Sequence, residues 1–151
     1  MPRIRYAVRQ DAPIVMKLVN KLLAELRGHS VTMDETALID KTKTFLKNKQ
    51  VIALLLTTEG SDIGLITISP CKAIRTEGEY GIIQEFYIEP EFRSKGYGKE
   101  LLEKAYHIAR TKKWPRLEVG APSLPQWERT LKFYEKNGFE QCGPRLKWVN
   151  Q

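Results

Sequence analysis

The sequence is poor in the residues that cross-link small proteins. It contains two cysteines, Cys71 and Cys142, and neither belongs to a C-x-x-C motif or a Cys/His cluster. Protein zinc ligands come in such clusters, so we expect no metal site. We expect two reduced thiols, with a disulfide as the alternative. A chain of 151 residues buries about 70% of the surface that its unfolded form exposes, so it needs neither cross-link to fold.

Long apolar runs are also missing. The first five residues lack the apolar core of a signal peptide, and no later run reaches the ~20 residues of a membrane span. Internal repeats, low-complexity tracts and linkers are absent as well. We therefore expect a soluble, cytoplasmic protein that consists of one domain, residues 1–151, and has no membrane partner.

Positive charge is in excess, but it is not concentrated. The chain has 25 Lys and Arg against 18 Asp and Glu, a net charge of +7. Such an excess favours an anionic partner, which is a nucleic acid, a membrane surface or a phosphorylated cofactor. The basic residues are scattered over helical segments, as is typical of a solvated surface. No nucleic-acid recognition motif is present, so we expect no nucleic-acid partner.

Hydrophobic periodicity predicts alternating strands and helices. The predicted strands are 4–8, 51–56, 63–69, 81–88, 116–119 and 139–149, the last one interrupted near Gly143-Pro144. One predicted helix runs from an Asp11 cap to Gly28, a second follows an Asp34 cap, a third runs towards Lys113, and a fourth covers 126–136. This order predicts an α/β (α+β) protein with helices on both faces of a mixed sheet.

The segment 82–102 is the most informative part of the chain. It reads as a buried strand, a short connector with Gly96 and Gly98, and an amphipathic helix. A helix N-terminus exposes unpaired N–H groups, and glycines let a phosphate approach the backbone, while Lys95 and Lys99 add charge. The third glycine of the dinucleotide fingerprint and the P-loop motif are both absent. The segment therefore predicts a phosphate cradle of another kind.

The wider pattern around these glycines is more specific. Residues 85–102, EFYIEPEFRSKGYGKELL, resemble the acetyl-CoA-binding core of the GNAT acyltransferase superfamily, including its R-x-x-G-x-G signature. The segment FYEKNGF at 133–139 is similar to a second recurrent segment of that family, and Arg9-Gln10-Asp11 also fits. The predicted order of elements matches the family along nearly the whole chain.

The resemblance implies the acyl-CoA N-acyltransferase fold, with a mixed, mostly antiparallel sheet of about six to seven strands and about four helices on both faces. The central strands of that sheet splay apart. The pantetheine arm of acetyl-CoA, the co-substrate, would lie in the splay beside Phe86, Tyr87 and Ile88, and the Ile88 N–H would polarise the thioester. The expected pyrophosphate contacts are Arg93, Ser94, Lys95, Gly96, Tyr97, Gly98 and Lys99.

Two side chains are predicted to be catalytic. Alternation places Glu85 on one face with Ile83 and Tyr87, and a partly buried carboxylate has a raised pKa that suits a base. The alternative for Glu85 is a salt bridge or a position at a rim. Tyr134 matches the position from which family members protonate the departing CoA thiolate, with simple packing as its alternative. The implied reaction is direct attack by an amine without a covalent enzyme intermediate, so no cysteine is needed.

The chain departs from the family at Trp127. Many members have an Asn there that binds pantetheine, so Trp127 is a candidate for the cofactor contact, for the acceptor pocket, or for a surface position at a helix start. We expect Trp114 and Trp148 to be packing residues.

The expected function is transfer of an acetyl group to a primary amine of a small molecule or peptide. A non-catalytic acyl-CoA-binding regulatory domain is the alternative. The acidic residues Glu77, Glu79 and Glu85 favour a cationic amine. A homodimer is compatible with the resemblance, because many family members dimerise.

Overall fold

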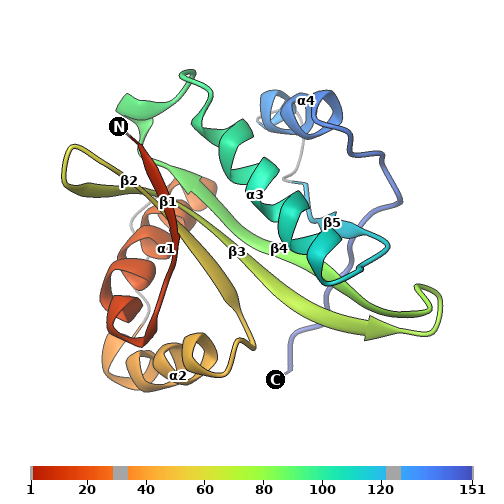
Figure 1. Cartoon of the computed structure of the whole chain (residues 1–151), viewed down its shortest axis with the longest axis horizontal. Helices are drawn as coiled ribbons and strands as arrows, with labels where there is room; N and C mark the ends of the chain where they lie inside the picture. Colours follow the sequence, from red (N-terminus) through yellow and green to blue (C-terminus); the bar gives the residue numbers. More distant parts are fainter. Residues whose placement is uncertain (1, 29–33, 122–126, 151) are drawn as a thin grey trace. The chain divides into compact units, whose positions relative to one another are not determined.

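In the described part of the chain, five strands form one mixed sheet in the order β1-β2-β3-β4-β5, in which only β4 and β5 are parallel (Figure 1). Their bounds are β1 Arg3–Tyr6, β2 Ile52–Thr58, β3 Ser61–Ala73, β4 Gly78–Ile88 and β5 Leu117–Val119. The computed structural model describes residues 2–28, 34–121 and 127–150. The expected mixed, mostly antiparallel architecture is confirmed, with five strands in place of about six to seven.

Four α-helices and two short 3-10 helices complete the described structure. They are η1 Arg9–Asp11, α1 Ala12–Arg27, α2 Glu35–Lys47, η2 Pro90–Phe92, α3 Tyr97–Thr111 and α4 Glu128–Lys136. Gly28 ends α1 in a left-handed conformation with φ 73°, as expected for a C-terminal glycine. The Asp34 carboxylate accepts a hydrogen bond from the Ala37 N–H at 3.3 Å, which confirms the predicted cap of α2.

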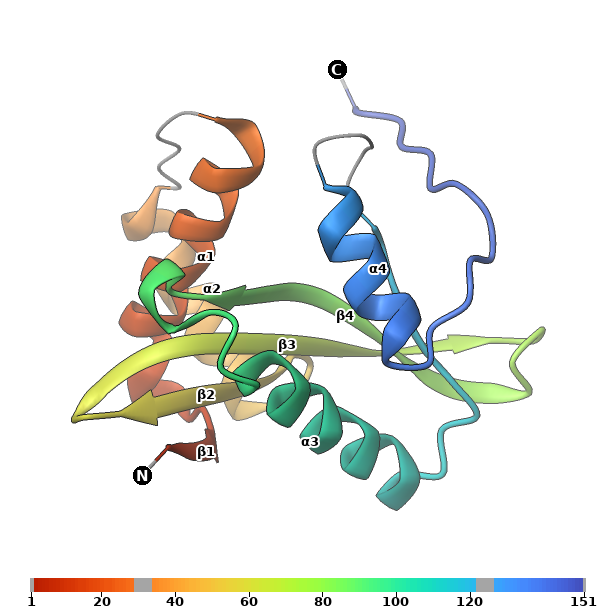
Figure 2. The same cartoon turned by 90° about the horizontal axis from the view of Figure 1, so that it is seen from above.

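The chain divides into two compact units, Met1–Val119 and Gly120–Gln151. In the first unit, α1 and α2 cover one face of the sheet and α3 covers the other (Figure 2). On the first face, side chains of α1 and α2 pack with Leu55, Leu65 and Tyr87. On the second face, the helical spacing of α3 buries Leu101, Leu102, Ala105, Ile108 and Ala109. Helices on both faces are therefore confirmed for this unit.

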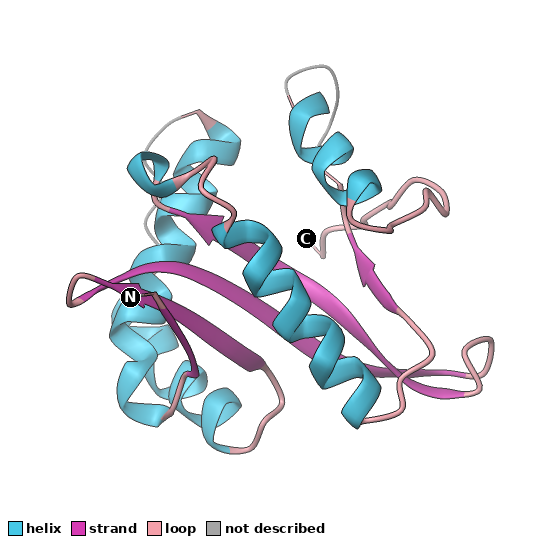
Figure 3. Ribbon diagram, turned by 45° about the horizontal axis from the view of Figure 1, so that its top comes forward, coloured by secondary structure: helices cyan, strands magenta, loops and turns pink. Residues whose placement is uncertain are grey.

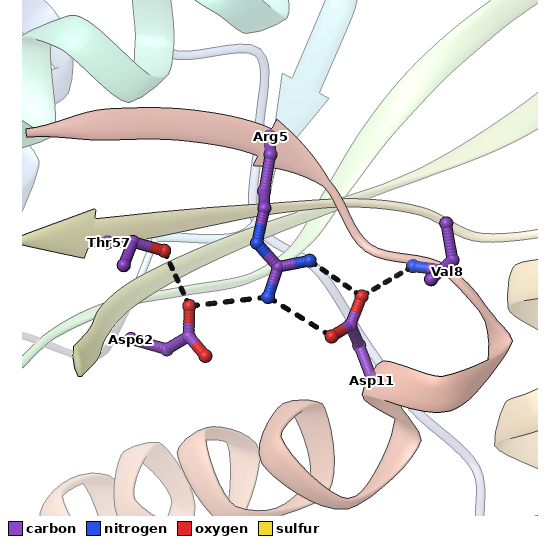
Figure 4. Close-up of polar contacts among 5 residues, drawn as sticks. All are labelled: Arg5, Val8, Asp11, Thr57 and Asp62. Atoms are coloured by element: carbon purple, nitrogen blue, oxygen red, sulfur yellow. Dashed lines mark hydrogen bonds and ion pairs between the residues drawn. The ribbon is translucent and has the colours of Figure 1, made fainter. Parts of the chain in front are cut away.

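A polar network joins the N-terminal strand to the β2–β3 hairpin (Figure 4). Arg5 donates from both Nη atoms to the Asp11 carboxylate, at 2.8 and 3.1 Å, and its Nη2 lies 3.5 Å from Asp62. The Thr57 hydroxyl donates to Asp62 at 2.6 Å. Asp11 directly precedes α1, but its side chain does not cap that helix. It accepts from the Val8 N–H at 2.8 Å and so caps η1.

The second unit contains α4 and an extended C-terminal segment. The predicted strand 139–149 is wrong, because none of the described residues from Phe139 to Asn150 takes part in a sheet. Gly143, with φ 115°, and Pro144, which has no N–H, interrupt the run where ladder hydrogen bonds would have to form. Trp148 was expected to pack and is instead 81% exposed. The missing strand accounts for the lower strand count.

Candidate functional site

The outer edge of β4 is open over its second half. β4 pairs with β5 only at Gly81–Ile83, and no other described strand covers β4 from there to Ile88. The Glu89 N–H donates to the Ile63 carbonyl at 2.8 Å, so strand alternation turns the N–H and C=O of Ile88 away from β3. By the same alternation, the backbone N–H and C=O of Phe86 also face the open edge. The central strands part as expected, and an extended ligand with amide groups can pair with this edge.

A β-bulge at Gln84 determines which way Glu85 faces. Thr67 pairs with Glu85, but the next residue, Ile68, pairs with Ile83, so Gln84 is an extra residue in β4. The bulge resets the alternation, so that Glu85 and Tyr87 share the face covered by α1 and α2, and Ile83 lies on the α3 face. The expectation that Ile83 shares a face with Glu85 is therefore wrong, because strict alternation fails at a bulge.

Glu85 is held by one buried neighbour. The Thr67 hydroxyl donates to the Glu85 carboxylate and accepts from the Glu85 backbone N–H, the latter at 3.0 Å. Burial raises the pKa of Glu85 above its ordinary value, and the Thr67 bond partly offsets this rise. No cation among the described residues forms an ion pair with Glu85, so the salt-bridge alternative is not found there. A carboxylate in this state suits a general base.

The predicted acidic cluster does not form. Register places Glu79 on the α3 face, opposite to Glu85, and Glu79 accepts a hydrogen bond from Trp114 Nε1 at 2.7 Å. Glu77 lies in the turn at the tip of the long β3–β4 hairpin (Figure 3), with φ 59°. Glu77 therefore belongs to the hairpin turn and Glu79 to the contact with Trp114, and neither lies beside Glu85. Trp114 is 7% exposed, which confirms its packing role.

The connector between β4 and α3 presents a free helix N-terminus. Ser94 and Gly96 both have left-handed backbone conformations, with φ 63° and 87°, and α3 begins at Tyr97. The Glu100 N–H donates to the Gly96 carbonyl at 3.2 Å, so the preceding N–H groups of the first turn have no partner within the helix. Apart from its two chain neighbours, no described residue has an atom within 4 Å of a Cβ built on Gly96, so its conformation and not crowding favours glycine here. This arrangement suits an anion.

The signature arginine, Arg93, binds α1 and β4. Its Nη2 lies 2.7 Å from a Glu25 carboxylate oxygen of α1, and its Nε donates to the Ile88 carbonyl at 2.7 Å. Its guanidinium lies 5.3 Å from the centre of the Tyr87 ring. The side chain of Arg93 thus fixes the connector to the sheet and to α1. The other two cations of the segment, Lys95 and Lys99, are exposed.

A second group of contacts at the end of β4 was missed by sequence reasoning. The Tyr87 hydroxyl donates to Glu89 at 2.9 Å, and Lys21 Nζ of α1 lies 2.5 Å from the other Glu89 oxygen. Burial and the Glu89 carboxylate raise the pKa of Tyr87. Burial opposes ionisation of Glu89, but bonds from Lys21 and Tyr87 lower its pKa overall. The Tyr87 ring is part of the core, and no sequence pattern links Lys21 to Glu89.

The two remaining predicted site residues lie in the second unit. Tyr134 is 6% exposed, and its ring packs edge-to-face on Phe139 with centroids 5.4 Å apart. Burial raises the pKa of Tyr134 to about 12, so its hydroxyl is protonated at neutral pH. Trp127 is half-buried and precedes α4, where its carbonyl accepts the N–H groups of Thr130 and Leu131.

Other kinds of site are not found in the described part of the chain. Across residues 2–28, 34–121 and 127–150, no three His, Cys, Asp or Glu side chains are grouped as a metal site would require. No described helix is both long enough and apolar enough to cross a membrane. Cys71 and Cys142 are free thiols.

Comparison with known families gives one match to this chain. The family model described as "Acetyltransferase (GNAT) domain" matches residues 48–141, which include the β4 edge, the α3 connector and Tyr134. No curated protein sequence matches the chain.

Solved structures of similar fold cover almost the whole chain. A predicted acetyltransferase with acetyl-CoA from Clostridium acetobutylicum has a TM-score of 0.82 at 19% identity, over 99% of this chain and 96% of that one. An aminoglycoside acetyltransferase from an uncultured soil metagenomic sample has 0.82 at 15% identity, over 100% and 99%. A ribosomal-protein-alanine N-acetyltransferase from Brucella melitensis biovar Abortus 2308 has 0.72 at 18% identity, over 100% and 99%. At such identities the likeness concerns the fold.

Proposed function

The chain belongs to the GNAT acetyltransferase family, and on this premise we propose that it transfers the acetyl group of acetyl-CoA to a primary amine of a small molecule or peptide. One observation carries the proposal. The open edge of β4 leads, through a short connector, to the free N-terminus of α3. An extended arm with amide groups and a pyrophosphate are the two parts of CoA that these features suit.

In the proposed reaction, Glu85 accepts a proton from the acceptor ammonium. The free amine attacks the thioester carbonyl, whose oxygen receives a hydrogen bond from the outward N–H of Ile88. The C–N bond forms, the C–S bond breaks, and Tyr134 donates towards the departing sulfur. The nitrogen loses its second proton to solvent as the amide forms, and Glu85 passes its proton to solvent. The sulfur keeps the proton that Tyr134 gives it, and Tyr134 recovers one from solvent, so that each turnover releases one proton overall. The enzyme forms no covalent intermediate.

The phosphate groups are assigned to the backbone of residues 93–99, with Lys95 and Lys99 as additional charges. Phe86 contributes its outward backbone groups and Ile88 its N–H to the acetyl-pantetheine arm, while the Ile88 carbonyl accepts from Arg93 and the Tyr87 backbone pairs with β3. Trp127 replaces the amide side chain of many relatives. We assign it to the wall of the acyl-CoA or acceptor pocket, because an indole offers an apolar surface there.

We propose that the whole chain works as one domain. The family match at 48–141 runs across the boundary between the two compact units at Val119 and Gly120, which supports this proposal. The free thiols of Cys71 and Cys142 are consistent with a cytoplasmic location.

The acceptor is tested with a panel that the structural relatives suggest. Two of them are named as acting on aminoglycosides and on ribosomal-protein alanine, so the panel contains aminoglycosides and peptides with free N-termini, together with polyamines and amino acids. We expect CoA release, measured with a thiol reagent, above the background without acceptor. A thermal shift with acetyl-CoA measures binding separately.

The two readouts separate the possible outcomes. A shift together with CoA release for one acceptor class supports the proposal. A shift with no release for any acceptor would favour a domain that binds acyl-CoA without turnover. If acetyl-CoA gives neither a shift nor release, the assignment of the β4 edge and the α3 connector is wrong.

A further inference from the structure

A concave site lies between η1 and α2, apart from the β4 edge. It is a surface pocket of about 320 Å³, lined by Arg9, Asp40, Lys43, Thr44 and Lys47. None of these residues belongs to the β4 edge, to the α3 connector or to α4. The pocket therefore shares no residue with the site assigned above.

The helical residues of this pocket form one face of α2. Asp40, Lys43, Thr44 and Lys47 follow the spacing i, i+3, i+4, i+7, which places them in one row along the helix. Arg9 in η1 lines the same pocket, and η1 and α2 are in contact. Other residues of α2, Ile39 and Leu46, pack into the core. The charged row is thus separate from the side of α2 that stabilises the fold.

The positive charge of this pocket is not neutralised. It has three cations, Arg9, Lys43 and Lys47, against one carboxylate, Asp40. None of the three cations has an ion pair or a side-chain hydrogen bond with any described residue, and Asp40 lies beyond ion-pair distance from all of them. Lys43 and Lys47 are also a like-charged pair at i, i+4, which disfavours the helix in the absence of a counter-ion.

We propose that this pocket binds a phosphate group, either free or as the terminal group of a small phosphate ester. The Arg9 guanidinium offers a planar set of donors that matches phosphate oxygens, and the two ammonium groups supply charge. The Thr44 hydroxyl is a further donor at the same site. A phosphate bound between Lys43 and Lys47 removes their mutual repulsion. The Asp40 carboxylate opposes the anion and limits its affinity.

Titration with inorganic phosphate at constant ionic strength tests the site, with binding followed by calorimetry and by thermal shift. We expect saturable binding to the wild-type chain and a loss of about tenfold in affinity in the double variant Lys43→Gln, Lys47→Gln. The matched control is Lys41→Gln, which removes the same charge from the same helix outside the row and should bind as wild type. Asp40→Asn should bind more tightly, because it removes the one opposing charge.

Three outcomes would overturn the proposal. The first is no saturable binding of phosphate to wild type or Asp40→Asn. The second is equal loss in Lys41→Gln and in the double variant, since that indicates a general charge effect. The third is single-stranded RNA binding more tightly than phosphate and being lost in the same double variant, which would indicate a nucleic-acid surface.

A parallel titration with glycerol phosphate distinguishes the two sources of the phosphate group, because an ester that binds more tightly than inorganic phosphate shows that the site takes the ester. The acetyl-CoA thermal shift should be the same in wild type and in the double variant. The phosphate titration and the acetyl-CoA thermal shift therefore test the two proposed sites independently.

Discussion

Burial acts on Glu85 and Tyr134 in the same direction but with different chemical consequences. Both pKa values are raised. For Glu85 the rise brings a carboxyl group closer to neutral pH and makes it a better base. For Tyr134 the value of about 12 lies above that of a thiol, near 8.5, so full proton transfer to a thiolate is uphill by about 5 kcal/mol. In the proposed reaction, Tyr134 is therefore most effective as a hydrogen-bond donor to the departing sulfur.

Replacing Tyr134 tests this role. Tyr134→Phe should lower kcat by about 10²-fold, because the departing sulfur loses its donor, and should leave the acetyl-CoA thermal shift nearly unchanged. Steady-state kinetics and the thermal shift are measured on the same preparation. Phe133→Leu is a control for packing in α4, since it alters a neighbouring ring and keeps the hydroxyl. Wild-type turnover in Tyr134→Phe would remove the assignment.

Glu85 is the base of the proposed reaction, and this role predicts how activity depends on pH. A base must be deprotonated, so the rate should fall as pH drops through the raised pKa of Glu85. Glu85→Gln should lower kcat/KM by about 10²-fold or more and should remove this acidic limb. Thr67→Val removes the hydrogen bond that lowers the pKa of Glu85, so the limb should move to higher pH. If the rate falls at the same pH in both variants as in wild type, a group other than Glu85 is the base.

The raised pKa of Glu85 also predicts how the stability of the fold depends on pH. The folded-state pKa of Glu85 lies above its unfolded value, so its contribution to stability is present at low pH and is lost as pH rises through the folded pKa. Glu85→Gln should therefore be more stable than wild type at pH 8, whereas at pH 4 the difference should vanish. Thermal unfolding at the two pH values measures this. A chain destabilised at pH 8 by Glu85→Gln would contradict the cause that we assign to the shift.

At the scale of single elements, short-range signals were predicted well and pairing details were not. Gly28 and Asp34 determine helix ends through their own backbone and side-chain preferences, so the sequence was sufficient to find them. Gln84 carries no mark of a bulge, because the extra residue is defined only by the partner strand. The burial of the Glu85 carboxylate was thus predicted, its role as a base stays a prediction, and its face required the register of β3 and β4.

Arg93 links three elements, and this predicts a small, indirect effect on ligand binding. Glu25→Gln removes the charge that holds the Arg93 guanidinium, and an exposed ion pair contributes about 0–1 kcal/mol. Acetyl-CoA affinity should therefore fall by up to about fivefold. Arg93→Ala and the double variant should show a similar loss, because the two side chains act as one unit. If Arg93→Ala loses far more than Glu25→Gln, the guanidinium contacts the phosphates directly.

Gly81 allows the β4–β5 pair to form beside Trp114. A Cβ at Gly81 would lie 2.5 Å from Trp114 Cζ3 and 2.7 Å from Leu117 Cδ2. Gly81→Ala should therefore destabilise the chain by about 1–3 kcal/mol, as measured by urea unfolding. The control is Gly120→Ala, whose new Cβ would meet only the mobile end of Arg145, at 3.0 Å. Equal stability of both variants would contradict this account of the junction.

At the scale of the whole molecule, the order of elements was the most reliable prediction. Helical and strand periodicities are local, and their sequence along the chain agreed with the structure from β1 to α4. The predicted strand 139–149 failed because periodicity cannot show whether a partner strand is available. The alternation of Arg145, Leu146, Lys147 and Trp148 is present in the sequence, yet these residues remain outside the sheet.

The Arg5–Asp11 network connects distant parts of the first unit, so its loss affects the unfolding of that unit as a whole. The Arg5 bond lowers the pKa of Asp11. A lowered folded-state pKa gives stability that is present above the ordinary value of 3.8 and is lost as pH falls through the folded value. Asp11→Asn should cost about 1 kcal/mol at pH 7 and much less at pH 3, by urea unfolding. An equal cost at both values would show that charge is not involved.

The bulge at Gln84 separates two tasks within one strand. The first half of β4 packs against Trp114 and pairs with β5, and the second half holds Glu85 and Ile88, to which we assign the proposed chemistry. Because Gln84 is unpaired, Ile83 and Glu85 pair with the adjacent residues Ile68 and Thr67, and the direction of the Glu85 side chain depends on this register with β3. Deletion of Gln84 would leave Ile83 opposite Ile68 and Glu85 opposite Thr67, so both side chains would keep their faces and only the bulge would be lost. Deletion of a paired residue between Glu85 and Ile88 would instead shift the register at the open edge by one and move side chains to the other face.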